Sequence, residues 1–157
     1  GHHATTALCL TVLSDLLDAG RVKAGQHFLD LGTGSGVLSI ACCKSGLTGE
    51  GYDIDPLAVE NALENKVLNG IDGFEVGLGS IDALEGRTYD LVLANILARP
   101  LIELAPRIVW ACKGGACLVL SGLLEIQADS VEEAYMAQCL PKPRRVIDGE
   151  WCALVWE

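Results

Sequence analysis

Short apolar runs alternate with stretches of helical periodicity along the whole chain. The short runs are typical of buried strands, and the longer stretches place their apolar residues on one face of a helix. The pattern predicts strands at 26–31, 49–54, 74–77, 89–95, 116–121, 144–147 and 151–155. It predicts helices at 7–19, 37–44, 56–69, 100–112 and 126–138. Strands that alternate with helices indicate a doubly wound, mostly parallel α/β sheet.

Two local signals refine this prediction. Asp55 precedes Pro56, and an acidic cap followed by proline is typical of a helix start. Asp148-Gly149 separates the last two strands in the manner of a tight hairpin, so we expect the last strand to be antiparallel. We find no repeat or interdomain linker, and we expect residues 1–157 to form one domain. The chain does not begin with Met, which indicates a fragment or a processed form.

Composition narrows the classes of partner. The formal net charge is −10, which argues against a nucleic-acid surface because phosphate binding needs clustered Lys and Arg. An acidic surface suits a basic protein partner, although ordinary solubility explains the charge equally well. No stretch reaches the roughly 18 apolar residues of a membrane span. The 7 cysteines form no C-x-x-C pair, which favours reduced thiols in a cytoplasm over a disulfide framework or a metal site.

A glycine-rich loop is the strongest chemical signal. Gly32, Gly34 and Gly36 follow an apolar strand and open a helix, with Thr33 inside the loop. Glycine allows positive φ and lets a ligand lie against the main chain. Dinucleotide sites usually have the spacing G-x-G-x-x-G. Glycine at every second position is instead the spacing expected for S-adenosylmethionine (SAM), which we therefore predict as the cofactor.

Acidic residues stand at the ends of the first two predicted strands, where ligands of such sheets bind. Asp30 can accept hydrogen bonds from loop amides or, through water, from an ammonium group; bracing the loop is an equally good interpretation. Asp53 lies 21 positions after Gly32, near the roughly 20-residue offset of a ribose-binding acid. Asp55 is the competing candidate, but capping a helix already explains it. We place Ile54, next to Asp53, in the same cofactor site.

The third predicted strand leads to Gly79-Ser80-Ile81-Asp82. The Ile81 side chain can cover an adenine ring, and the Ser80 or Ile81 amide can meet its edge. A plain turn over 77–83 is the alternative.

Asn95 and Ile96 follow the fourth predicted strand and are our candidates for the reacting end of the site. A methyl group on a sulfonium is already electrophilic, so amine methylation needs mainly positioning and desolvation of a neutral amine. The Asn95 side-chain oxygen and the Ile96 carbonyl can accept two N–H groups and aim the lone pair, and we expect Asn95 also to face the methyl donor. The alternative is a plain turn residue or helix cap.

Six sequence blocks resemble the catalytic domain of the PrmA family, the methyltransferases of bacterial ribosomal large-subunit protein eleven. The blocks are Gly1-His2-His3-Ala4-Thr5-Thr6, Asp30-Leu31-Gly32-Thr33-Gly34-Ser35-Gly36, Asp53-Ile54-Asp55-Pro56-Leu57-Ala58-Val59, Ala94-Asn95-Ile96-Leu97-Ala98, Lys113-Gly114-Gly115 and Leu120-Ser121-Gly122-Leu123-Leu124. The resemblance implies a Rossmann-like class I SAM-dependent methyltransferase acting on α-amino and lysine amino groups of a basic ribosomal protein. It also implies that Thr5 and Thr6 lie over the cofactor, where the sequence alone suggests caps of the first helix.

The same resemblance has implications for the N-terminus of the chain. It implies that His2-His3 is native rather than a tag remnant, and that the N-terminal substrate-recognition domain of the family is absent from this chain. Two other functions stay open at this point. One is a class I methyltransferase acting on another amine, and the other is a non-catalytic SAM-binding module.

Overall fold

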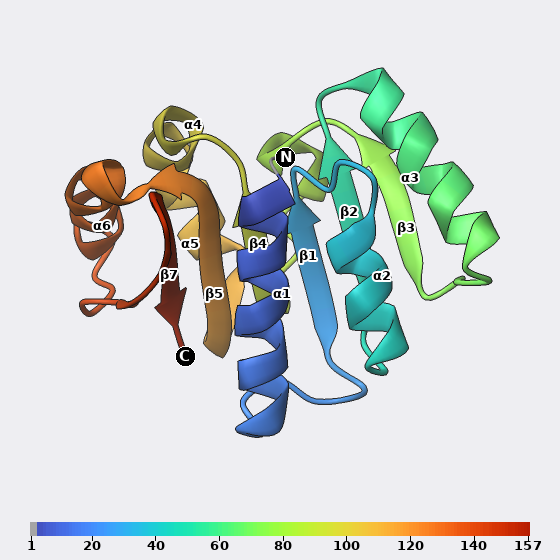
Figure 1. Cartoon of the computed structure of the whole chain (residues 1–157), viewed down its shortest axis with the longest axis horizontal. Coiled ribbons are helices and arrows are strands. Elements are labelled where there is room, and N and C mark those ends of the chain that lie inside the picture. The colour runs from blue at the N-terminus through green and yellow to red at the C-terminus, as the bar shows by residue number, and fades with distance from the viewer. Residues whose placement is uncertain (1–2) are drawn as a thin grey trace.

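The computed structural model describes residues 3–157, so Gly1 and the expectation for His2 lie outside it. Seven strands form one sheet: β1 (His27–Leu31), β2 (Thr48–Asp53), β3 (Phe74–Leu78), β4 (Tyr89–Asn95), β5 (Cys112–Leu124), β6 (Arg144–Asp148) and β7 (Trp151–Trp156). Their order is β3-β2-β1-β4-β5-β7-β6 (Figure 1). β7 runs antiparallel to β5 and β6, and the pairs from β3 to β5 are parallel. The predicted doubly wound sheet with an antiparallel last strand is confirmed.

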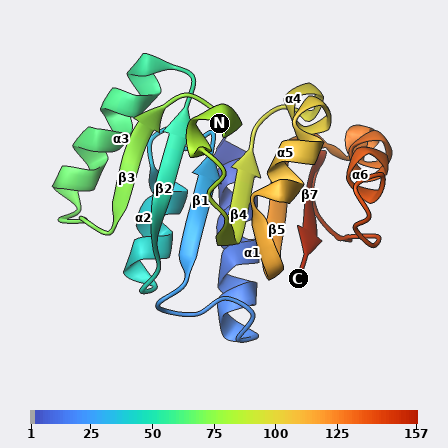
Figure 2. The ribbon, with the colours of Figure 1, turned by 180° about the vertical axis from the view of Figure 1, so that it is seen from behind.

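Helices cover both faces of this sheet (Figures 1 and 2). The first face carries α1 (His3–Asp18), α2 (Val37–Lys44) and α3 (Pro56–Leu68). The second carries α4 (Ala98–Glu103), α5 (Ala105–Trp110) and α6 (Ala128–Met136), with short 3₁₀ turns η1 (Ile81–Leu84) and η2 (Glu125–Gln127). Right-handed crossovers between parallel strands require this two-sided arrangement. It brings the carboxyl ends of β1, β2 and β4 to one edge.

Three predicted elements differ from the structure by more than two residues at one end or in their continuity. The first helix begins at His3, so Thr5 and Thr6 lie inside α1 rather than capping it, and that part of the prediction is wrong. The helix expected at 100–112 is two helices that meet at Leu104, because Pro106 lacks the N–H that would continue the ladder. The strand expected from 116 begins at Cys112 and contains Gly115 at φ +81° in an irregular stretch.

Two apolar clusters fill the two sides of the sheet. In β4, Leu91 and Leu93 point to the side covered by α1 and α2, while Val92 and Ala94 point to the side of α4–α6. This strand is buried on both faces, as its continuous apolar sequence requires.

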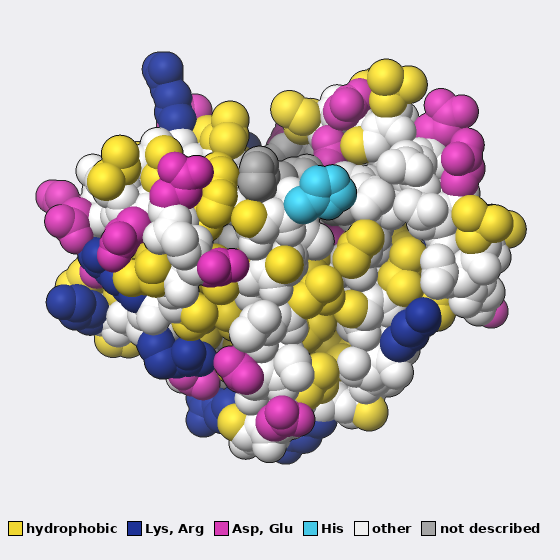
Figure 3. All heavy atoms as spheres, viewed as in Figure 1, with side chains coloured by type: hydrophobic (Ala, Val, Ile, Leu, Met, Phe, Trp, Pro, Cys, Tyr) yellow, Lys and Arg dark blue, Asp and Glu magenta, His cyan; other side chains and the backbone are white. Residues whose placement is uncertain are grey.

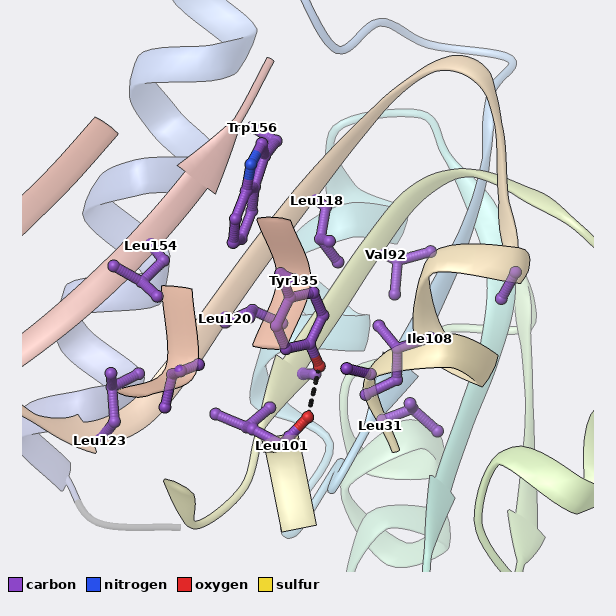
Figure 4. Close-up of a cluster of buried hydrophobic side chains, with 14 of the residues drawn as sticks. Leu31, Val92, Leu101, Ile108, Leu118, Leu120, Leu123, Tyr135, Leu154 and Trp156 are labelled. Atoms are coloured by element: carbon purple, nitrogen blue, oxygen red, sulfur yellow. Dashed lines mark hydrogen bonds between the residues drawn. The ribbon is translucent and has the colours of Figure 1, made fainter. Parts of the chain in front are cut away.

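The apolar cluster on the α4–α6 side of the sheet also anchors α4. Tyr135 of α6 lies 5.5 Å from the ring of Trp156, measured between centroids. Its hydroxyl donates to the Leu101 carbonyl at 2.8 Å (Figure 4). α4 directly follows the end of β4, so this contact stabilises the chain just beyond Asn95.

A polar network lies on the same side of the sheet, over β2. Glu50 Oε2 accepts hydrogen bonds from Tyr52, Tyr89 and Arg87 at 2.6–3.0 Å. The Glu50 side chain is 12% exposed. On this face the chain between β3 and β4 forms only the short η1, so the network over β2 takes the place of apolar helix packing.

Candidate functional site

Two adjoining cavities open at the carboxyl ends of β1, β2 and β4. One has a volume of about 270 Å³ and is lined by Leu31, Gly32, Asp53, Ile54, Gly79, Ser80, Asn95, Ile96, Leu97, Pro100 and Leu104. The other has a volume of about 440 Å³ and is lined by His3, Thr6, Gly32, Thr33, Gly34, Ser35, Val37, Leu38, Leu57, Ala58, Asn61 and Asn95. Gly32 and Asn95 line both cavities. One elongated ligand can therefore occupy both cavities and pass these two residues.

The glycine loop forms the floor between the cavities. Gly32, Gly34 and Gly36 have φ of +74°, +56° and +84°, which side chains of L-residues rarely adopt. A Cβ on Gly32 would lie 2.6 Å from Ile96 Cγ2 and 2.9 Å from the Asn95 carbonyl oxygen. The loop thus packs directly on the start of the Asn95–Ile96 turn, in addition to exposing its main chain to the cavities.

Asp30 lies beneath this loop and is fully buried. Its Oδ2 accepts hydrogen bonds from the Thr33 and Ser39 hydroxyls, both at 2.8 Å. Its Oδ1 has no hydrogen-bond partner among residues 3–157. Burial raises the pKa of the Asp30 carboxyl, against the lowering effect of the bonds from Ser39 and Thr33. Asp30 therefore braces the loop, one of the two roles inferred from the sequence. It lines neither cavity, and its contact with a cofactor stays a prediction.

Asp53 joins the end of β2 to the glycine loop. Its Oδ2 accepts from the Gly34 amide at 3.0 Å, and its Oδ1 accepts from the Asp55 amide at 3.0 Å. Asp53 and Ile54 line the smaller cavity, while the Asp55 side chain accepts from the Leu57 amide and caps α3. The cap prediction for Asp55 is confirmed, and Asp53 is the acid that faces the cavity.

Asn95 ends β4 at the junction of the cavities and is 7% exposed. Its Nδ2 donates to Thr6 Oγ1 of α1 at 3.4 Å. Within the described part of the chain, its Oδ1 lacks a hydrogen-bond partner. The amide is thus oriented with its donor side engaged, and its buried acceptor oxygen is left unsatisfied at the junction of the cavities. Thr5, the neighbour of Thr6, is buried and lines neither cavity.

The region after β3 is split between cavity and core. Ser80 lines the smaller cavity next to Gly79. Ile81 is only 6% exposed and belongs to the apolar cluster of the second face, so the structure does not bring its side chain to the cavity wall. The segment is not a plain turn, since η1 begins at Ile81.

Sequence reasoning missed part of the lining of the site, most of which is apolar. Leu97, Pro100 and Leu104 close one side of the smaller cavity, and Leu57 and Asn61 of α3 line the larger one. Leu57 and Leu97 fall inside two of the blocks that carry the family resemblance, but nothing in the sequence marks Asn61, Pro100 or Leu104 as lining a site. Only the tertiary arrangement assigns them to the cavities.

Residues 3–157 contain no group of three or more His, Cys, Asp or Glu side chains placed to hold a metal ion, and their cysteines are free thiols. None of the helices described has the length and apolar character needed to cross a bilayer.

Comparison with known proteins identifies close relatives. The family model described as "Ribosomal protein L11 methyltransferase (PrmA)" matches residues 1–157. The L11 methyltransferase of Pelobacter propionicus is 40% identical over 158 residues, covering 99% of this chain and 51% of the relative. That of Agrobacterium fabrum is 42% identical over 160 residues, covering 98% and 54%. The chain thus spans about half the length of the curated relatives it matches.

Solved structures agree with this assignment. The ribosomal protein L11 methylase of Lactobacillus delbrueckii subsp. bulgaricus superposes with a TM-score of 0.89 at 30% identity, covering 99% of this chain and 79% of the other. An RNA methyltransferase of Salinibacter ruber, solved in complex with S-adenosyl-L-homocysteine, superposes with a TM-score of 0.73 at 22% identity, covering 93% and 89%. The second likeness shows the fold alone, which is that of class I SAM-dependent methyltransferases.

Proposed function

Because the chain belongs to the PrmA family of ribosomal protein L11 methyltransferases, we propose that it binds SAM and methylates amino groups of a basic ribosomal protein, L11. The acceptor nitrogens are the α-amine and lysine side chains. A ribosomal substrate also places this activity in the cytoplasm. The observation that carries the proposal is the unpartnered amide oxygen of Asn95, held where the two cavities meet.

The cofactor fits the donor set of the two cavities. Asp53 offers carboxylate oxygens to the two ribose hydroxyls, and Ile54 and Ser80 lie beside it for the adenine. The main chain of Gly32 and Gly34, with Thr33 and Thr6, borders the larger cavity, which suits the amino-acid part. Asp30 beneath the loop supplies negative charge for a cationic ligand.

Bound SAM supplies an electrophilic methyl group on its sulfonium. Asn95 Oδ1 and the Ile96 carbonyl accept N–H groups of the incoming amine and direct its lone pair along the line of displacement. Leu97, Pro100 and Leu104 exclude water from the neighbouring cavity. Desolvation lowers the pKa of an amine, which favours the neutral form that reacts.

The charge distribution suits a basic acceptor. On the face shown in Figure 3, acidic side chains gather along the upper part of α3, near the edge that carries the site, and most Lys and Arg side chains lie farther from it. The net charge of −10 adds to the negative electrostatic field around the chain. Such a field speeds encounter with a cationic partner and disfavours direct binding to nucleic acid.

A methyl-transfer assay tests the proposal. The chain is incubated with methyl-labelled SAM and purified L11, and with a panel of small amines as competing acceptors. We expect label on L11 amino groups, located by mass spectrometry. Label only on a small amine would favour a methyltransferase of the same fold with another substrate. Tight SAM binding without any transfer would favour a non-catalytic module.

A further inference from the structure

A β-bulge in β5 lies opposite the end of β4. Along β5, Leu120 pairs with Leu154 and Leu123 pairs with Cys152, so three steps on β5 face two steps on β7. The extra residue falls at Ser121-Gly122, and Gly122 has φ +89°. Asn95 is the β4 partner of Ser121. Bulges with a left-handed glycine bend a strand locally and are frequent next to active sites.

Gly122 contacts the main chain of the turn that follows Asn95. A Cβ on Gly122 would lie 2.3 Å from the Ile96 carbonyl oxygen, 2.9 Å from its carbonyl carbon and 3.1 Å from its nitrogen. These are backbone atoms, so they cannot move aside as a flexible side chain would. Gly32 approaches the preceding carbonyl, at the Asn95 oxygen, and also Ile96 Cγ2. The main chain of Asn95 and Ile96 is therefore held between the glycine loop after β1 and the bulge in β5.

Ser121, the other residue of the bulge, reaches α1. Its buried hydroxyl donates to the Thr5 carbonyl at 3.3 Å. The next residue of α1, Thr6, accepts from the Asn95 side chain. The bulge thus contacts the main chain of Ile96 directly through Gly122. It also supports the Asn95 side-chain amide indirectly, because Ser121 binds the part of α1 whose Thr6 accepts from that amide.

We infer that Gly122 is a positioning residue for methyl transfer, because the Ser121-Gly122 bulge sets where the Ile96 carbonyl and the Asn95 amide meet the acceptor amine. The inference rests on the proposed function. Gly122 lines neither cavity, so it acts through the Asn95–Ile96 turn and not by touching a ligand in the cavities.

Gly122→Ala tests this inference, with Gly115→Ala as the matched control. Gly115 lies in the same strand at φ +81°, but a Cβ there meets nothing within 4 Å. Both variants carry similar backbone strain, and only one displaces the Asn95–Ile96 turn. We expect Gly122→Ala to lower kcat about 10- to 100-fold while the Kd for SAM changes less than about threefold. Gly115→Ala should keep both values near wild type.

Amide chemical shifts give a readout that does not depend on activity. In ¹⁵N-labelled Gly122→Ala, the Asn95, Ile96 and Leu97 amides should shift more than the same amides do in Gly115→Ala. Unchanged kcat, or equal losses of kcat and SAM affinity, would overturn the inference. If the wild-type chain methylates no amine, the proposed function fails instead, and unchanged amide shifts would then separately overturn the packing role of Gly122.

Ser121→Ala keeps the inference testable if Gly122→Ala does not fold. This change adds no atoms and deletes the hydroxyl that holds Thr5. We expect a several-fold loss of kcat with nearly unchanged SAM affinity, and a wild-type kcat in this variant would count against the bulge.

Discussion

The Asp53 carboxylate accepts a hydrogen bond from the Gly34 amide at 3.0 Å, although the two residues belong to different βα units. This bond ties the end of β2 to the glycine loop at the end of β1. A single side chain therefore fixes the loop conformation and presents a carboxylate to the smaller cavity.

Asp53→Ala should weaken SAM binding about 10- to 100-fold, since a charged acceptor for the ribose hydroxyls is lost. Calorimetric titration measures the change. Asp55→Ala is the matched control, two residues away. It removes the cap of α3 and should lower the free energy of unfolding by about 1 kcal/mol with little effect on affinity. Equal effects of the two variants on affinity would contradict the assignment of Asp53.

Asn95→Ala should lower kcat by about 100-fold or more, because it removes an acceptor that orients the amine. SAM affinity should change much less. Asn95→Asp keeps the shape but places a carboxylate beside the amine, which stabilises the ammonium form. Its activity should be low near neutral pH and recover as pH rises. An Asp variant with the wild-type pH profile would argue against contact with the amine.

The buried Asp30 carboxyl should make the fold less stable as pH rises. Burial raises its pKa in the folded state above the ordinary value of 3.8. The folded state then binds more protons than the unfolded state, so the contribution of Asp30 to stability falls as pH rises from about 3.8 through the raised pKa. Asp30→Asn should gain thermal stability relative to wild type at pH 8, and the gain should shrink toward pH 4. A difference in Tm that is constant across this range would contradict the account.

The Asp30→Asn variant should also bind SAM less tightly, because the negative charge beneath the loop is gone. Stability and cofactor affinity would then change in opposite directions. Buried charges at functional sites commonly show this trade-off.

Glu50→Gln should destabilise the fold by about 1–3 kcal/mol, since its anionic oxygen accepts from Tyr52, Tyr89 and Arg87 in a half-enclosed network. Urea unfolding measures this loss. Glu103→Gln breaks the exposed i,i+4 pair with Arg99 and should cost less than about 0.5 kcal/mol. Similar losses for both variants would show that the network adds nothing beyond surface pairing.

Much of the fold follows from local signals. The helix over 37–44 and the strand over 89–95 have the predicted bounds, because the glycine loop and the apolar run define them locally. The break at Leu104 also has a local cause in Pro106, but the helical periodicity of residues 100–112 predicts one continuous helix. The irregularities in β5 depend on pairing with β4 and β7, and no single strand sequence carries that information.

The site divides in the same way. The sequence predicts Asp30, Asp53 and Asn95 as site residues because strand ends meet at one edge of a parallel sheet. Asp53 and Asn95 line the cavities, whereas Asp30 is buried beneath the glycine loop. Whether Ile81 turns toward the core or the cavity depends on the register after β3, which the sequence leaves open. The predicted cofactor and acceptor roles of the site residues remain predictions for the experiments above.

We propose that this chain transfers a methyl group from SAM to an amine held at Asn95 and Ile96. A single-turnover reaction with labelled SAM and L11 measures this transfer, with wild type and Asn95→Ala each saturated with cofactor. We expect rapid labelling of L11 amino groups by wild type and a rate at least about 100-fold lower for Asn95→Ala. Equal rates for the two proteins, or saturation with SAM and no labelled amine, would contradict it.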